Sequence, residues 1–373
     1  MNSDEFWLRL LMIKGIGAGK LNKLTHIFNA QTNSHEQALD CLNLSQEQKH
    51  AFSFPNARYL DKALMWLEDK NNRMLLPGEN DYPSALYQLG EAPPILFIRG
   101  NSQSLQKPQV AMVGSRNYSQ YGEQWGRYFA QELAICGLAI TSGLASGIDG
   151  ICHRGALDVQ GTTIAVLGSG LANVYPKKHQ RLSEEIVDNG GVLVSEYLPT
   201  ESPLAVHFPK RNRIISGLSL GVLVIEASLR SGSLITARCA LEQGREVFAL
   251  PGNLGCSGSE GVHWLIQQGA YLVAQPTDIL EQLNTSLNWV PLLPPESINE
   301  TIPTLENEQE LPFSDVLANV GDEVTPVDIV ADKVGQSVSD VVVKLLDLEL
   351  AGWIKAVPGG YIRIRKVGYV RYG

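Results

Sequence analysis

The chain has 373 residues, of which 44% are apolar and 18% charged, and its formal net charge is -9 at pH 7. This length predicts two or three domains, and the apolar content excludes a disordered chain because it can supply a large core. The negative balance argues against a protein that binds nucleic acid over its whole surface, although it leaves room for a local basic groove.

The start of the chain and its cysteines suit a reducing, aqueous compartment. The first residues, MNSDEFWLRLLMIKGIG, are acidic where a secretory signal carries basic residues. No run of about 18 apolar residues occurs that would span a membrane. The five cysteines are scattered and include no C-x-x-C pair, which argues against a disulfide framework and a structural zinc site. We therefore expect a cytoplasmic protein without a membrane segment.

Residues 1–74 are predicted to form a small helical module, because apolar residues recur at helical spacing over 6–11 and 21–28. Between these runs, KGIGAGK at 14–20 predicts a tight turn that joins two helices. It does not fit a P-loop, since Leu21 stands where Ser or Thr would hold magnesium. Two interpretations stay open: a SAM-like or helix-hairpin-helix module that contacts DNA phosphates through backbone N–H groups, or a plain helical hairpin.

Residues 75–283 alternate between short apolar, β-rich runs and helical stretches. Runs that are apolar on every side and separated by helices are typical of a parallel sheet covered on both faces. We therefore predict an α/β domain with a doubly wound, Rossmann-like parallel sheet. The predicted strands are 110–113, 138–141, 163–167, 192–195, 221–225, 246–250 and 271–274.

Two further segments follow this domain. Residues 284–310 are rich in Pro, Asn, Ser and Glu and lose all periodicity, which predicts a linker. Residues 311–373 show three helical patches and end in GWIKAVPGGYIRIR, where two short strands flank Pro-Gly-Gly. Helices followed by such a hairpin resemble a winged-helix domain.

Four predicted strands are followed by loops of glycine and serine. In an open parallel sheet the carboxyl ends of the strands share one edge, and ligands bind there. Glycine lets backbone N–H groups approach an anion, and the helix N-termini that follow favour phosphate. One such loop would equally fit an ordinary turn, but four indicate a binding site. The candidates are Gly114, Ser115, Arg116, Ser142, Gly143, Gly168, Ser169, Gly170, Ser231, Gly232 and Ser233.

No pattern for a nucleotide cofactor is complete in these loops. The dinucleotide fingerprint requires a third glycine, and Asn173 occupies that position after Gly168 and Gly170. A Walker A sequence is also absent. We therefore expect no cofactor, and a polymer of phosphates becomes the favoured ligand.

A small basic cluster lies in HFPKRNRIISG at 207–217, between two predicted strands. A guanidinium there can pair with phosphate oxygens or stack on a base. Basic and aromatic residues beside glycine loops are typical of a groove for single-stranded nucleic acid. A solvated face is one alternative, and an arginine buried against Glu196 or Glu226 is another. The candidates are Phe208, Lys210, Arg211, Asn212 and Arg213, with Lys177 and Lys178 after the third glycine loop.

Five stretches together resemble the DNA processing protein A family, also called DprA or Smf. They are GSR at 114–116, TSGLASGIDGICHRGAL at 141–157, VLGSGLANVYPKKH at 166–179, HFPKRNRIISGLS at 207–219 and RSGSLITARCALEQGREVFALPGN at 230–253. The resemblance covers the whole chain. It implies a protein that is not an enzyme, binds and protects incoming single-stranded DNA, and loads the RecA recombinase in natural transformation.

The resemblance also implies site residues and a homodimer formed through the Rossmann-like domain. It assigns phosphate binding to Arg116 and a basic strip along the DNA path to 208–213. Some members carry a lysine near the position of Ala205, so one phosphate contact is expected to have moved to Lys210 or Lys177. The segment 261–273 is a candidate for the dimer contact, and simple core is the alternative for it.

Two other pairs of residues could suggest catalysis or metal binding. Asp149 and His153 share a helix face and could act as a catalytic acid–base pair or as metal ligands. An Asp helix cap and a packed histidine are the favoured interpretation. Cys256 and His263 lack a further ligand nearby. We therefore expect no catalytic residue and no metal.

Two alternative functions stay open. The chain could be a nucleotide-binding enzyme similar to the lysine-decarboxylase-like nucleotide phosphoribohydrolases, but RSGSLITA at 230–237 lacks the catalytic glutamate that follows their PGG-x-GT stretch. The winged helix could read duplex DNA, but its recognition helix near 337–350 is acidic, with Asp340, Asp347 and Glu349 against Lys344. Only the wing is basic, through Arg363, Arg365 and Lys366.

Overall fold

The structure is a computed structural model that describes residues 2–30, 39–40, 42–89, 92–287, 313–321 and 324–363. The chain divides into two compact units, Met1–Val290 and Pro291–Gly373. Within the predicted linker at 284–310, only 284–287 is described, at the end of the helix α13 (Pro276–Leu287). The rest of that segment and the wing residues Arg365 and Lys366 lie outside the described residues.

The first unit begins with helices, which confirms the helical N-terminal region. Phe6 and Trp7 are fully buried, and the ring of Phe6 meets that of Phe52 edge-on with 5.7 Å between centroids. After the first helix the chain turns at Gly15, whose φ of +80° favours glycine. The helices are α1 (Ser3–Leu11), α2 (Ala18–Ala30), α4 (Gln46–Ser53) and α5 (Ala57–Leu67).

The α/β part contains a nine-stranded sheet in the order β1-β2-β6-β5-β4-β3-β7-β8-β9. Among the seven strands numbered β3 to β9, every neighbouring pair is parallel. Each of these strands overlaps a predicted strand, which confirms the Rossmann-like fold. These strands are β3 (Gln109–Val113), β4 (Ala139–Ser142), β5 (Thr163–Val166), β6 (Val192–Ser195), β7 (Gly221–Val224), β8 (Glu246–Ala249) and β9 (Tyr271–Leu272).

One edge of the sheet differs from the prediction. β1 (Asn72–Leu75) and β2 (Leu96–Gly100) pair in antiparallel fashion, and β2 pairs antiparallel with β6. The sheet is therefore mixed rather than wholly parallel, because two short strands that the sequence analysis missed extend it. β1 also crosses the predicted domain boundary between residues 74 and 75, and the position of that boundary stays a prediction.

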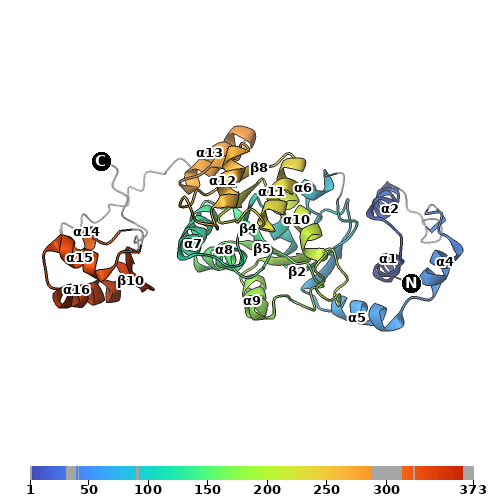
Figure 1. Ribbon diagram of the computed structural model, residues 1–373. Helices are drawn as coiled ribbons and strands as arrows, with labels where there is room; N and C mark the ends of the chain where they lie inside the picture. Colours follow the sequence, from blue (N-terminus) through green and yellow to red (C-terminus); the bar gives the residue numbers. More distant parts are fainter. Residues whose placement is uncertain are drawn as a thin grey trace, which may run out of the picture. The chain divides into compact units, whose positions relative to one another are not determined.

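Helices cover both faces of the sheet, so β3 is buried on both sides (Figure 1). Ala111 and Val113 share a core with α10 and α11, whereas Val110 and Met112 share one with α7 and α8. This layering explains the continuous apolar run of β3. The helices of this part are α6 (Ser84–Tyr87), α7 (Gln120–Ile135), α8 (Ile148–Asp158), α9 (Gln180–Asp188), α10 (His207–Leu218), α11 (Ser233–Glu242) and α12 (Glu260–Gln267), with the 3-10 helices η1 (Ser102–Gln106) and η2 (Lys177–His179).

The second unit is a small winged helix, as predicted. Its core joins Val330, Val341, Leu345 and Ile354 from three elements. The wing turns at adjacent glycines with positive φ, of which Gly359 has a φ of +99°. The elements are α14 (Ser314–Ala318), α15 (Val327–Val334), α16 (Val338–Leu350), β10 (Ile354–Val357) and β11 (Gly360–Arg363). No described helix in either unit is both long and apolar enough to cross a bilayer.

Candidate nucleic-acid interface

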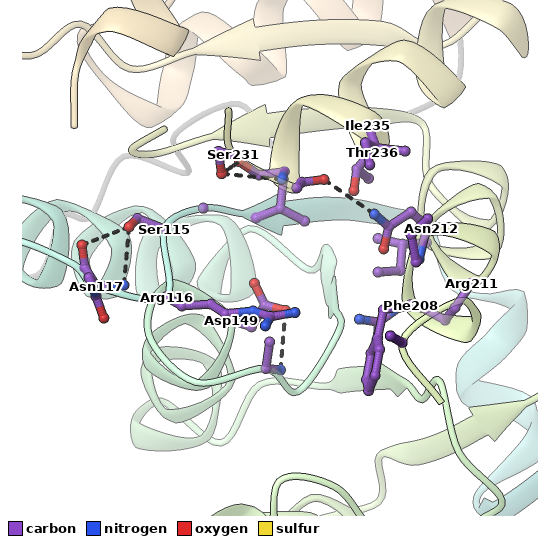
Figure 2. Close-up of a pocket in the computed structure, with 18 of the residues that line it drawn as sticks. Ser115, Arg116, Asn117, Asp149, Phe208, Arg211, Asn212, Ser231, Ile235 and Thr236 are labelled. Carbon is purple, nitrogen blue, oxygen red and sulfur yellow. Dashed lines mark hydrogen bonds between the residues drawn. The ribbon is translucent and has the colours of Figure 1, made fainter. Parts of the chain in front are cut away.

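A pocket of about 850 Å³ lies beyond the carboxyl ends of β3 and β7 (Figure 2). β4, the next strand along the chain, pairs with one side of β3, whereas β7 pairs with the other side. This is the topological switch point of a doubly wound sheet, where loops leave on opposite faces and open a crevice for ligands. The lining includes Gly114, Ser115 and Arg116 after β3 and Ser231, Gly232 and Ser233 after β7.

Two helices bring further residues to the pocket. Phe208, Arg211 and Asn212 come from the first turns of α10, and Asp149 comes from the first turn of α8. Asn212 Nδ2 donates to Gly232 O at 3.3 Å, which ties α10 to the N-terminus of α11 (Figure 2). The fold therefore brings together predicted residues from three separate stretches of the sequence.

Arg116 presents an available positive charge at this pocket. Its side chain is exposed, and none of the salt bridges in the described ranges uses it. The backbone around it is ordered, because Ser115 Oγ donates to Asn117 O at 2.6 Å and accepts from Asn117 N at 3.1 Å. The loop thus offers a cation on a defined backbone, which suits a phosphate ligand.

Phe208 forms an aromatic surface beside Arg116. The guanidinium carbon of Arg116 lies 5.9 Å from the centroid of the Phe208 ring, and the exposed Tyr175 ring lies 5.6 Å from it on a tilted plane. A Cβ at Gly168 would lie 2.9 Å from the Phe208 ring. The close approach of this ring explains a glycine at position 168, and phosphate binding by Gly168 stays a prediction.

Arg211 lines the pocket but is only 4% exposed, and its guanidinium donates hydrogen bonds to backbone carbonyl groups inside the protein. Its Nη1 donates to Gly143 O at 2.6 Å and also to Val166 O, which joins α10 to the ends of β4 and β5. Burial raises the pKa of Asp149, and the charge of Arg211 is the largest influence that opposes this. Burial lowers the pKa of Arg211 to about 10, so it stays charged at neutral pH. Phosphate binding by Arg211 stays a prediction.

The other predicted cations fall into two groups. Arg213 is half-buried and donates through Nη2 to Glu196 Oε2 at 2.5 Å. Glu196 was named in the sequence analysis as one possible carboxylate partner of an arginine in this cluster. Lys177, Lys178 and Lys210 are exposed, but the described lining of the pocket does not include them. They are available to a ligand that extends beyond the pocket.

In the second and third glycine loops, two of the expected amides already have partners inside the protein. Gly143 N donates to Asp149 Oδ2 at 3.1 Å, and Gly170 N donates to Glu201 O at 2.9 Å. An N–H that is already hydrogen-bonded inside the protein cannot also bind phosphate without losing that partner. Phosphate binding by Gly143 and Gly170 stays a prediction, and their N–H groups would have to give up Asp149 and the segment before α10 for it.

The serines of those two loops are also used internally. Ser142 Oγ donates to Met112 O at 2.6 Å, and Ser169 Oγ donates to Asn173 O at 2.8 Å. Both serines are buried and neither is part of the described pocket lining. The first and fourth loops therefore line the pocket. The serines of the second and third loops bond inside the protein, although Ala145 of the second loop is part of the described lining.

Several lining residues escaped the sequence analysis. Pro203, Ser228, Ile235 and Thr236 line the pocket; Ser228, Ile235 and Thr236 lie on either side of the Gly-Ser loop at 231–233, and Pro203 precedes the basic cluster at 207–217. Glu226, just after β7, contacts the Arg116 loop and was considered only as a partner for an arginine. The closeness of the first four residues to these two motifs in the sequence was an available signal.

The pair of Asp149 and His153 is structural. The cap residue of α8 is Gly147, so the predicted Asp cap is wrong in detail, and Asp149 instead accepts from Gly143 N and from Ala145 N at 3.2 Å. His153 is fully buried, as expected, with Nδ1 at 2.6 Å from Thr163 Oγ1, and burial lowers its pKa to about 3. No group of three or more potential metal ligands occurs among the residues described.

Three family models match the chain. The SMF/DprA SAM domain matches residues 1–65, the DNA recombination-mediator protein A model matches 73–284, and the DprA winged helix domain matches 303–360. The second model alone spans more than half of the chain. The chain belongs to the DprA/Smf family. The resemblance inferred from the five sequence stretches is thereby confirmed.

Relatives of the DprA/Smf family match over most or all of the chain. Protein Smf of Escherichia coli is 50% identical over 372 residues, which cover 100% of this chain and 98% of that protein. The structure of DprA from Streptococcus pneumoniae is 37% identical with a TM-score of 0.66, over 76% of this chain and 99% of that one. A structure of Helicobacter pylori DprA, which concerns the single-stranded DNA binding mode of that protein, is 32% identical with a TM-score of 0.52, over 58% and 96%.

Proposed function

We propose that this DprA/Smf protein binds single-stranded DNA across the carboxyl edge of its sheet, through the pocket at the switch point. The observation that carries the proposal is the pairing of an exposed Arg116, which forms no salt bridge in the described ranges, with the aromatic surface of Phe208 and Tyr175. A cation binds the phosphate while a ring stacks on the base beside it. Phosphates and the faces of bases carry little sequence information, so binding is largely independent of sequence.

The charges around the pocket support a strand that continues past it. Arg116, Lys177, Lys178 and Lys210 are all exposed and form no salt bridge in the described ranges, unlike Arg213. Exposed cations without a described salt bridge, on a chain of net charge -9, concentrate attraction for a polyanion in one place. The single-stranded DNA binding of Helicobacter pylori DprA supports the same ligand here.

We further propose the cellular role that the family resemblance implies. The protein protects incoming single strands in the cytoplasm and loads the RecA recombinase on them in natural transformation. It acts as a homodimer, whose two grooves favour long strands through avidity. In the candidate contact at 261–273, Val262 and Leu265 belong to the core, but Trp264, Tyr271 and Leu272 remain 42%, 45% and 52% exposed for a second copy.

The pocket gives little support to the enzyme alternative. Asp149 is the only carboxylate among the described residues that line it, and its Oδ2 accepts two backbone N–H groups. A general base must reach the proton that it removes, and this oxygen is occupied by the loop. Release of ribose from a panel of nucleotides, measured beside a gel shift with oligo-dT, separates the two functions.

The winged helix gives little support to duplex reading. Asp340 and Asp347 are exposed on α16, and its lysine, Lys344, donates to Gln336 Oε1 at 2.7 Å and lies 3.8 Å from Asp315. A recognition helix enters a groove flanked by phosphates, which an acidic surface repels. The described surface of α16 is therefore more suited to a protein contact.

Binding of oligo-dT should fall steeply with salt and should exceed binding of the matching duplex. If four cations each neutralise one phosphate, affinity drops roughly fiftyfold between about 50 and about 200 mM salt. We expect the duplex to bind about tenfold more weakly, because its bases are stacked and cannot reach Phe208. Filter binding of both substrates across a salt series measures these effects. Equal affinity for both, or no salt dependence, would contradict the proposed function.

Replacing Phe208 with alanine should weaken oligo-dT binding by about 1 kcal/mol, roughly fivefold, because one stacking surface is lost. Phe208→Tyr should bind like the parent protein, since it retains the aromatic face. Fluorescence anisotropy with labelled oligo-dT measures both variants. A loss in the tyrosine variant equal to that in the alanine variant would argue against stacking.

A further inference from the structure

Glu226 follows β7, on the opposite side of the switch point from Arg116, and it makes three hydrogen bonds to the Arg116 loop. Its backbone oxygen accepts from Ser115 N at 2.7 Å. Its side-chain Oε2 accepts from Ser119 N and from Ser119 Oγ, both at 3.0 Å. One residue therefore holds both ends of the loop 115–119, which carries Arg116 between them.

The geometry leaves Glu226 little freedom. It is 8% exposed, and a Cβ at Gly122 would lie 2.2 Å from its Oε2. A Cβ at Gly258 would lie 2.4 Å from its Oε1. Glycine at both positions leaves space for the carboxylate of Glu226. Because this buried carboxylate is hydrogen-bonded to the loop, a shift of the loop would displace it. Such a displacement is costly because the carboxylate would lose its hydrogen bonds.

A carboxylate suits this position for an electrostatic reason. Ser119 caps α7, its Oγ accepts from Gly122 N at 3.0 Å, and Glu226 therefore lies at the N-terminus of a helix of 16 residues. The positive end of the helix dipole stabilises a negative charge there. No salt bridge of the described ranges involves Glu226, so its polar contacts with the loop are the hydrogen bonds to Ser115 and Ser119.

Glu226 is not suited to touch DNA itself. It does not belong to the described pocket lining, and its negative charge would repel a phosphate. We propose that Glu226 is a positioning residue, which acts through Arg116 by holding the 115–119 loop in the geometry that binds phosphate. This inference rests on the proposed function, in which Arg116 contacts single-stranded DNA.

A double-mutant cycle between Glu226→Ala and Arg116→Ala in the full chain tests the inference, with labelled oligo-dT as the probe. Glu226→Ala should weaken binding about fivefold in the parent protein and less than about twofold in the Arg116→Ala background, since two residues that act as one unit are not additive. Glu226→Gln should restore binding to within about twofold, because an amide oxygen still accepts from Ser119.

Further variants keep the test decisive if Glu226→Ala does not fold. Ser119→Ala removes the hydroxyl link and should show a smaller loss with the same dependence on Arg116. Glu123→Ala, which removes an acidic residue from the first turn of α7 without touching a described loop contact, should bind like the parent protein. Equal losses with and without Arg116, or unchanged binding in folded Glu226→Ala and Ser119→Ala proteins, would overturn the inference. If Arg116→Ala alone changes nothing, the proposed contact of Arg116 with DNA fails first, and this inference falls with it.

Discussion

Replacing Arg116 with alanine is expected to weaken oligo-dT binding by about 2 kcal/mol, roughly thirtyfold, while the melting temperature stays unchanged. This is the typical size of a hydrogen bond to a charged group. The fold should tolerate the change because Arg116 is exposed and forms no salt bridge within the described ranges. Fluorescence anisotropy gives the affinity, and thermal denaturation gives the stability.

Arg127→Ala is the matched control for this prediction. It removes the same charge from an exposed arginine of α7, which pairs with Asp158 at 2.7 Å and lies outside the described pocket lining. If binding depended only on net charge, both variants would lose the same affinity. A normal affinity of a well-folded Arg116→Ala protein would remove Arg116 from the interface.

Replacing Arg211 with alanine is expected to lower the free energy of unfolding by about 3–5 kcal/mol, because it leaves two buried carbonyl oxygens without a donor and removes the positive charge that opposes the burial of Asp149. Arg211 holds Gly143 O and Val166 O, and its charge opposes the effect of burial on Asp149. Unlike Arg116→Ala, this variant should lose stability first and DNA binding only as a consequence. Chemical denaturation measures the loss.

The stability loss of Arg211→Ala should depend on pH in a defined direction. Burial raises the pKa of Asp149 in the folded protein above its value of 3.8 in an unfolded chain. The folded state therefore binds more protons, and stability falls as the pH rises through this range. Without Arg211 the pKa rises further, so the deficit relative to the parent protein should be largest at neutral pH and shrink toward acidic pH.

A second substitution separates this explanation from a simple packing defect. Asp149→Asn combined with Arg211→Ala removes both buried charges, so it should recover part of the lost stability and show a weaker pH dependence of the deficit. Arg238→Ala, which removes an exposed arginine of α11, should leave the melting temperature unchanged. A deficit in Arg211→Ala that stays constant across pH would show that Asp149 is not the uncompensated charge.

The parallel part of the fold was predictable because burial on two faces leaves a strong local signal. β3 reads as a continuous apolar run since helices cover Ala111 on one side and Met112 on the other. β1 and β2 were missed because their short segments become strands only through antiparallel pairing with the edge of the sheet. Such pairing depends on residues far away in the sequence.

Of the candidate site, residue chemistry and order along the chain indicated Arg116, Phe208 and the Gly-Ser loop at 231–233. These lie after strands, and the carboxyl ends of parallel strands meet at one edge whatever the details of packing. The sequence by itself therefore determined the family, and it predicted the edge and the type of ligand of the proposed site. These depend on local periodicity and on long motifs, both of which are visible in a single chain.

Only the tertiary structure decided which residues of that edge are free. Arg116 and Arg211 are alike in the sequence, yet one is exposed and the other is 4% exposed and bonded to two carbonyl oxygens. The glycines at 143 and 170 resemble those of a phosphate loop, but their N–H groups already have partners. Whether a cation or an amide can serve a ligand depends on which distant groups the fold brings against it, and that information does not lie in the residue's own neighbourhood.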